Sequence, residues 1–97
     1  MAKRVLETGR IALTRGVFDA TSGNEPFTRF VCESLARHTM GDWGDVCEED
    51  KQSNNEALKC GDRILSAYDY AANPDLNIWI ITEYDRSVTT VLFPREY

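Results

Sequence analysis

The order of hydrophobic and polar positions predicts one strand, then two helices, then three strands. From Arg10 to Val17 apolar side chains alternate with small or polar ones, and the turn-forming residues 21–24 end this first predicted strand. Residues 1–9 have mixed charge and weak patterning. We therefore expect residues 1–9 to form a mobile end or a short extension of the first strand.

Apolar residues at three- and four-residue steps predict the first helix. Pro26 suits its first turn, because proline lacks an N–H that would have no partner there, and Gly41 is the expected stop. The predicted inward stripe consists of Phe27, Phe30, Val31, Ser34, Leu35 and His38. His38 is expected on the buried side of the last turn, where the helix dipole favours its protonated form.

A second helix is predicted from Asp45 to about Lys59, with Gly61 past its end. Asp45 is placed to cap it, and the glutamate three residues later completes a capping box. The side expected to face inward carries Val46, Asp50, Asn54 and Leu58. Because two of these four residues are polar, the helix either packs through its ends alone or presents Asp50 and Asn54 to a polar site.

A period of two begins at Asp62 and predicts the next strand, in which Ser66 and Tyr68 share a face opposite Arg63. Residues 78–82 form the most apolar run, which predicts a central strand buried on both faces, Trp79 included. A polar break at residues 84–87 then leads into a hairpin partner, residues 88–93.

The chain is therefore expected to form a single α+β domain, 1–97, with the element order β-α-α-β-β-β. Two helices would pack on an antiparallel sheet of three to four strands. The loops at residues 18–25 and 38–45 would lie near the ends of the sheet. The pattern leaves open whether the first strand joins the main sheet.

Composition indicates a compartment. No stretch reaches the roughly 20 apolar residues of a membrane span, and no apolar signal core follows the first residues, so we expect a cytoplasmic protein without a membrane partner. The spacing of Cys32, Cys47 and Cys60 matches neither a metal knuckle nor a disulfide framework. We expect reduced thiols, with Cys32 and Cys47 buried beside apolar helix positions.

The net charge is −5, and the acidic excess is local. The acidic residues of this excess are Asp42, Asp45, Glu48, Glu49 and Asp50, and the other 11 of the 16 acidic residues balance the 11 lysines and arginines. A nucleic-acid partner would therefore need a local basic patch or a few placed arginines. Carboxylates in the first turns of a helix also have a structural explanation, because the helix dipole favours them there.

Five motifs between residues 10 and 97 carry the most distinctive sequence. They are His38-Thr-Met-Gly-Asp-Trp-Gly-Asp, Asn54-Asn-Glu-Ala-Leu, Gly61-Asp-Arg-Ile-Leu-Ser-Ala-Tyr68, Ile78-Trp-Ile-Ile-Thr-Glu and Asp85-Arg-Ser-Val-Thr-Thr-Val-Leu-Phe-Pro94. Together they resemble a family of small bacterial proteins carried by plasmids, phages and integrated elements, some of them labelled as methylation subunits of type I restriction enzymes. This chain has no Gly-rich cofactor loop and no Asn-Pro-Pro-Tyr or Asp-Pro-Pro-Tyr motif, so the resemblance implies no methyltransferase activity.

The order of elements also resembles the metal-independent ribonuclease fold of barnase-like and RelE-like toxins. Under this hypothesis the catalytic residues are His38, Arg63, Ser66, Tyr68 and Thr82. Cleavage by a neighbouring 2′-hydroxyl needs a base, an acid and a cation, which His38, Tyr68 and Arg63 would supply. Strand parity places Arg63 on the face opposite Ser66 and Tyr68 unless a bulge intervenes, and the acidic composition also disfavours RNA.

The leading hypothesis is a non-enzymatic accessory domain of a mobile element that binds a protein partner. Its predicted partner-binding residues are Asp42, Trp43, Asp45, Glu48, Glu49 and Asp50. Such a surface would engage a basic partner or imitate the charge of a nucleic acid. The structural alternatives are a core position for His38 and a plug role for Trp43.

A third hypothesis is a small-molecule or metal binder, in which His38, Asp42, Asp45 and Glu49 would be the metal ligands. We expect no metal and no cofactor, and nucleic acid would be a partner only of the ribonuclease. Monomer and homodimer both stay open.

Overall fold

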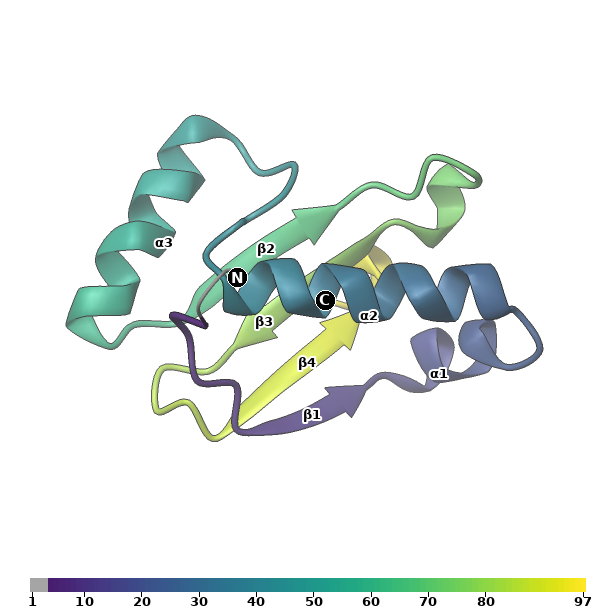
Figure 1. Ribbon diagram of the computed structural model, residues 1–97, viewed down its shortest axis with the longest axis horizontal. Coiled ribbons are helices and arrows are strands. Elements are labelled where there is room, and N and C mark those ends of the chain that lie inside the picture. The colour runs from purple at the N-terminus through teal and green to yellow at the C-terminus, as the bar shows by residue number, and fades with distance from the viewer. Residues whose placement is uncertain (1–3) are drawn as a thin grey trace.

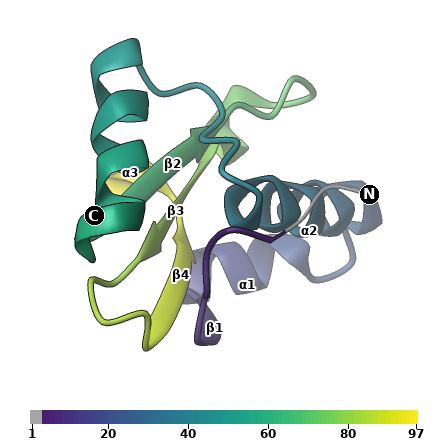
Figure 2. The same ribbon diagram turned by 60° about the vertical axis from the view of Figure 1, so that its left-hand side comes forward.

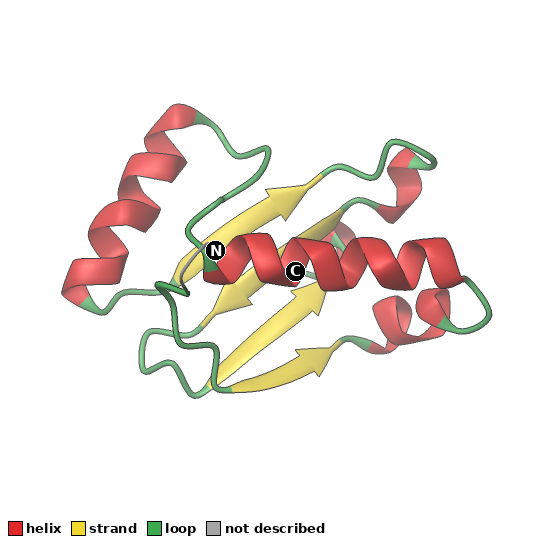
Figure 3. Ribbon diagram, viewed as in Figure 1, coloured by secondary structure: helices red, strands yellow, loops and turns green. Residues whose placement is uncertain are grey.

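The computed structural model describes residues 4–97 (Figures 1 and 3). Its helices and strands are β1 (Arg10–Leu13), α1 (Arg15–Thr21), α2 (Glu25–Thr39), α3 (Glu48–Cys60), β2 (Ile64–Tyr68), β3 (Ile78–Thr82) and β4 (Val88–Leu92). Two short 3₁₀ helices, η1 (Pro74–Leu76) and η2 (Pro94–Glu96), flank the last two strands. Residues 1–3, part of the expected mobile end, lie outside the described residues. The segment that follows them is packed, since Leu6 is buried and its N–H donates to the Thr39 carbonyl.

The predicted α+β class is confirmed, and the sheet has the strand order β1-β4-β3-β2. The meander β2-β3-β4 is antiparallel, as predicted. The first strand does join this sheet, but it lies parallel to β4, so the expectation of an antiparallel sheet is wrong for this pair. Parallel neighbours need a long connection, and here the three helices and the β2-β3 pair lie between β1 and β4 in the chain.

Helix α1 was not predicted, because its residues were assigned to the first strand and the following loop. Thr14 follows β1 and caps α1, since its Oγ1 accepts the Val17 N–H at 3.3 Å. Val17 is fully buried in the core. Leu13 and Val17 are four residues apart, a step that fits both a strand period of two and a helix period of 3.6. The alternation alone could therefore not distinguish the two structures.

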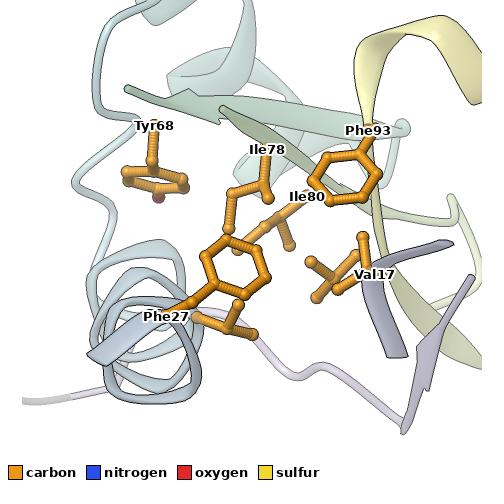
Figure 4. Close-up of a cluster of buried hydrophobic side chains, with 8 residues drawn as sticks. Val17, Phe27, Tyr68, Ile78, Ile80 and Phe93 are labelled. Carbon is orange, nitrogen blue, oxygen red and sulfur yellow. The ribbon is translucent and has the colours of Figure 1, made fainter. Parts of the chain in front are cut away.

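Helix α2 follows its predicted pattern. Asn24 caps it, Pro26 lies in the first turn, and the stripe from Phe27 to His38 faces the sheet. Figure 2 shows α1 and α2 on the same side of the sheet. The main core lies between them and the sheet, and its members are Val17, Phe27, Val31, Tyr68, Ile78, Ile80, Val91 and Phe93 (Figure 4).

Helix α3 lies beside the outer edge of β2 and does not share a face with α2, so only part of the predicted packing is observed (Figures 1 and 2). It begins at Glu48 with Cys47 as an N-cap that makes no side-chain hydrogen bond. The predicted Asp45 cap is therefore wrong. Gly61 ends the helix in the left-handed conformation, as expected.

The second face of the sheet carries Trp79, which is partly exposed and thus not the fully buried residue that was expected. The Tyr97 ring packs edge-on against Trp79, with 5.5 Å between ring centroids. All three cysteines are exposed, so the expectation of buried Cys32 and Cys47 is wrong. Cys32 lies on the exposed side of α2, and Cys47 is the exposed N-cap of α3.

Candidate functional site

Three of the five predicted catalytic residues meet in the interior, at the end of α2. His38 Nδ1 lies 2.6 Å from Ser66 Oγ, and His38 Nε2 lies 2.8 Å from Thr82 Oγ1. Thr82 Oγ1 is in turn 2.7 Å from Thr89 Oγ1, which donates to the Thr8 carbonyl at 2.8 Å. These five residues form a continuous hydrogen-bonded chain, which we call the His38 chain. It runs from β2 through α2 and across β3 and β4 to the segment before β1.

The last bond fixes the direction of every other bond in the His38 chain. A carbonyl can only accept, so the Thr89 hydroxyl proton is used on Thr8 and Thr82 must donate to Thr89. Nε2 of His38 must then donate to Thr82, which leaves Nδ1 to accept from Ser66. The geometry therefore assigns neutral His38 with its proton on Nε2.

Burial keeps His38 neutral. Its side chain has no exposed surface, and burial together with the nearby positive charge of Arg86 lowers the pKa of His38 from 6.5 to about 4. The expectation that the helix dipole would favour the protonated form is thus wrong, because desolvation outweighs it. A general base needs an unoccupied lone pair within reach of substrate, and the Nδ1 lone pair is occupied by Ser66.

The other two predicted catalytic residues do not join the His38 chain. The Tyr68 hydroxyl donates to the Asp42 carbonyl at 2.6 Å, and burial raises the pKa of Tyr68 to about 12. Arg63 is exposed on the opposite face, as strand parity predicted, and its Nη2 donates to the Tyr97 hydroxyl at 2.6 Å. The five predicted catalytic side chains therefore do not surround one accessible pocket.

The loop after α2 is fixed by specific contacts. Asp42 accepts two hydrogen bonds from the Arg37 guanidinium, at 2.8 and 3.2 Å, and this lowers the pKa of the Asp42 carboxyl. Trp43 is 3% exposed and packs against the His38 ring, while its Nε1 donates to Asn55 at 2.9 Å. Trp43 is thus a plug, one of its two predicted roles, and in this conformation it cannot touch a partner.

Gly44 lets this loop approach β2. Its φ is +74°, and a Cβ there would collide with the Ala67 carbonyl and lie 2.7 Å from the Tyr68 ring. Around it, the Ala67 N–H donates to the Trp43 carbonyl at 3.3 Å and the Asp45 N–H donates to the Ala67 carbonyl at 2.7 Å. The loop therefore pairs with the outer edge of β2 as a strand would.

Asn54 closes the rest of the β2 edge, a role that the sequence did not reveal. Its Nδ2 donates to the Leu65 carbonyl at 2.8 Å, and its Oδ1 accepts the Leu65 N–H at 3.4 Å. Asp45 Oδ2 accepts the Asp69 N–H at 2.9 Å. The one signal in the sequence was a polar residue on the inward side of a weakly apolar helix, and it pointed to a polar site of unknown kind.

The remaining predicted partner-binding residues lie on the outside. Glu48, Glu49 and Asp50 are exposed in the first turn of α3. Only Asn54 and Ala57 of this helix are buried. Because α3 uses so little of its surface for packing, most of it is open to a partner, and the three carboxylates lie at one end.

The hypothesis of a metal site finds no support in the geometry. Both ring nitrogens of His38 already have hydroxyl partners, and Asp42 is held by Arg37. Within residues 4–97, no group of three or more His, Cys, Asp or Glu side chains is arranged to hold a metal ion. No helix in the same range is long and apolar enough to cross a membrane.

Comparison of the chain with models of protein families, with curated proteins and with solved structures found no match.

Proposed function

We propose that this chain is a small non-enzymatic domain that binds a protein partner through an acidic surface. We define this surface as Asp42, Asp45, Glu48, Glu49 and Asp50, all of which are exposed. The observation that carries the proposal is the contrast between two sets of polar residues. Four of the five residues suited to catalysis are buried and hydrogen-bonded. Glu48, Glu49 and Asp50, in contrast, are exposed on a helix that contributes only two buried side chains.

The contacts divide the acidic surface into two parts. Asp42 and Asp45 have structural tasks, because one pairs with Arg37 and the other accepts the Asp69 N–H. Among residues 4–97, the side chains of Glu48, Glu49 and Asp50 make one ion pair, between Glu48 and Lys51 at 3.5 Å, which is exposed and therefore weak. These three carboxylates are the ones available for a partner, and they are the determinants that we assign to binding.

The chemistry of the surface indicates the partner. Clustered carboxylates attract a basic protein surface, raise the rate of encounter and select against acidic partners. A surface of this kind also imitates the charge of a nucleic acid, so a nucleic-acid-binding protein is a suitable class of partner. The motif resemblance described above supports a place among accessory proteins of plasmids and phages.

The ribonuclease alternative is not favoured by the geometry. His38 has no exposed surface and both its nitrogens are occupied. Arg63, the residue that would stabilise the phosphorane, lies on the other face of the sheet with its guanidinium bonded to Tyr97. A phosphodiester cannot touch both side chains at once in this structure.

The test reverses the charge of the three assigned carboxylates. A Glu48→Lys, Glu49→Lys, Asp50→Lys variant should lose the partner captured by the wild-type chain in crosslinking and mass spectrometry from its host. The control is a Glu25→Lys, Glu33→Lys, Asp75→Lys variant, which makes the same change in net charge at other exposed sites. A Glu48→Gln, Glu49→Gln, Asp50→Gln variant avoids placing lysines at a helix N-terminus, where they destabilise the helix.

Equal capture by the wild-type and reversed chains would disprove the proposal. Capture that is lost equally in the control variant would show a general effect of net charge and would also contradict it. Overproduction of the wild-type chain alone should leave cellular RNA intact. RNA cleavage that is lost in His38 and Arg63 variants would instead support the ribonuclease hypothesis.

A further inference from the structure

One edge of the sheet is covered by hydrogen bonds, and the other edge is unpaired. The outer edge of β2 is closed at Leu65, Ala67 and Asp69 by the hydrogen bonds of Asn54 and the loop before α3. At the other edge of the sheet lies β1, which pairs only with β4 in the described part of the chain. Figure 1 shows β1 at the lower margin of the sheet with no further strand or helix alongside it. An unpaired edge of this kind is a template for another strand.

The direction of the unpaired groups follows from the ladder. Arg10 and Thr14 donate their N–H groups to the Ser87 and Val91 carbonyls, both at 3.0 Å. In a parallel pair alternate residues bond to the same neighbour, so the N–H and C=O of residues 11 and 13 point away from β4. The free edge therefore offers two donors and two acceptors in strand geometry.

A groove lies beside this edge, on the side of the sheet that α2 covers. It has a volume of about 260 Å³ and is lined by Arg4, Thr8, Ile11, Leu35, Ala36 and Thr39. The Ile11 side chain is 45% exposed at its mouth. Because Ile11 pairs with Thr89, whose side chain points to the α2 side, a strand added here would direct every second side chain into the groove.

Charge indicates which strand fits. Arg4 lines the groove and Arg10 begins β1. With Glu7 between them, residues 4–10 carry a net charge of +1, although the protein as a whole is acidic. A second copy of β1 is a poor occupant, because residues 10–14 contain no carboxylate that could meet Arg4 and Arg10. An acidic end on a foreign segment meets Arg4 and Arg10 favourably.

We propose that the free edge of β1 is a docking edge for an extended segment of another protein, which adds a fifth strand antiparallel to β1. Its alternate apolar side chains enter the groove beside Ile11, and its C-terminal end carries carboxylates that meet Arg4 and Arg10. Backbone hydrogen bonds supply affinity, and the groove and arginines supply selectivity. This edge lies across the sheet from α3, so the proposal does not rest on the acidic surface.

The probe is the synthetic peptide Ser-Val-Thr-Val-Thr-Glu-Glu, labelled at its N-terminus and titrated with the full chain by fluorescence anisotropy. The amide signals of residues 11 and 13 should shift on binding in a ¹⁵N-correlated NMR spectrum, while those of residues 65 and 67 should not. The reversed peptide Glu-Glu-Thr-Val-Thr-Val-Ser should bind at least tenfold more weakly, because its carboxylates lie at the wrong end.

Two changes remove the backbone bonds. Methylation of the peptide amide nitrogens that face β1 should weaken binding at least tenfold. The same loss is expected for Ile11→Pro, since proline removes an outward donor and is tolerated at an edge.

An Arg4→Glu, Arg10→Glu variant should also bind at least tenfold more weakly, whereas Arg95→Glu should bind as the wild type does.

Three results would overturn the proposal. The first is the absence of saturable binding at millimolar peptide. The second is binding that neither N-methylation nor Ile11→Pro weakens, which would show attraction by charge alone. The third is a wild-type dimer in sedimentation equilibrium that Ile11→Pro dissociates, which would show a second copy on the edge. If Ile11→Pro does not fold, the N-methylated peptide still decides the question on the wild-type chain.

Discussion

Acidification should destabilise this protein chiefly through the protonation of His38. The pKa of an ordinary histidine side chain is 6.5, and burial lowers that of His38 to about 4 in the folded chain. Between these two values the unfolded chain binds a proton that the folded chain does not, so the free energy of unfolding falls as the pH falls. The stabilisation from neutral His38 is complete above pH 6.5 and is lost progressively toward pH 4.

The magnitude follows from the same two values. Each unit of difference in pKa corresponds to about 1.36 kcal/mol, so the loss between pH 7 and pH 4 is roughly 3 kcal/mol. The bonding pattern explains the cost, because a protonated Nδ1 becomes a donor and faces the Ser66 hydroxyl, which donates to it in the neutral state. Asp42 adds a loss of the same sign in acid, since the Arg37 hydrogen bond lowers its pKa.

The assay is urea unfolding at intervals from pH 4 to pH 8, compared between the wild type and His38→Gln. Both chains carry the same carboxylates, so the difference between their free energies of unfolding reports the titration of His38 alone. That difference should change by roughly 3 kcal/mol across the range. Because His38 is the only histidine, its ring protons also report its pKa directly by NMR. A difference that does not vary with pH, or a ring that titrates near 6.5 in the folded chain, would refute the reasoning.

Two further predictions concern the closed edge of β2. Asn54→Ala should lower the free energy of unfolding by about 1–3 kcal/mol and speed hydrogen exchange at the Leu65 amide. Both results are expected because the N–H and C=O of Leu65 lose their partner. Unchanged hydrogen exchange at Leu65 would contradict this prediction. Gly44→Ala should destabilise the chain far more than Gly23→Ala in thermal unfolding. Both glycines have positive φ, but a Cβ collides with Ala67 at the first and meets nothing within 4 Å at the second; equal losses would show that backbone strain alone matters.

The sequence predicted the α2 helix and the three-stranded meander because each is defined by a period that one element satisfies alone. The stripe from Phe27 to His38 fits only a helix, and the alternation through Ile64, Ser66 and Tyr68 fits only a strand with one buried face. Helix α1 was missed because the step from Leu13 to Val17 fits both periods.

Three of the five predicted catalytic residues come together, but the sequence did not show what kind of cluster they form. The sequence named His38, Ser66 and Thr82 together, and the fold does bring them together. Residue types cannot show whether such a cluster is open or sealed, because that depends on Trp43 and on the helix laid over the sheet. The exposure of Glu48 and its neighbours likewise depends on α3 lying at an edge.

By itself the sequence determined that residues of α2, α3 and the meander are helical or extended, and where the negative charge gathers, because these are local properties of neighbouring residues. The tertiary structure alone decided the rest. It placed β1 parallel to β4. It buried His38 as a neutral side chain with both ring nitrogens hydrogen-bonded. It also covered one edge of the sheet with Asn54 and left the other edge free. Each of these outcomes joins residues far apart in the chain, and only the packed fold sets the distance between such residues.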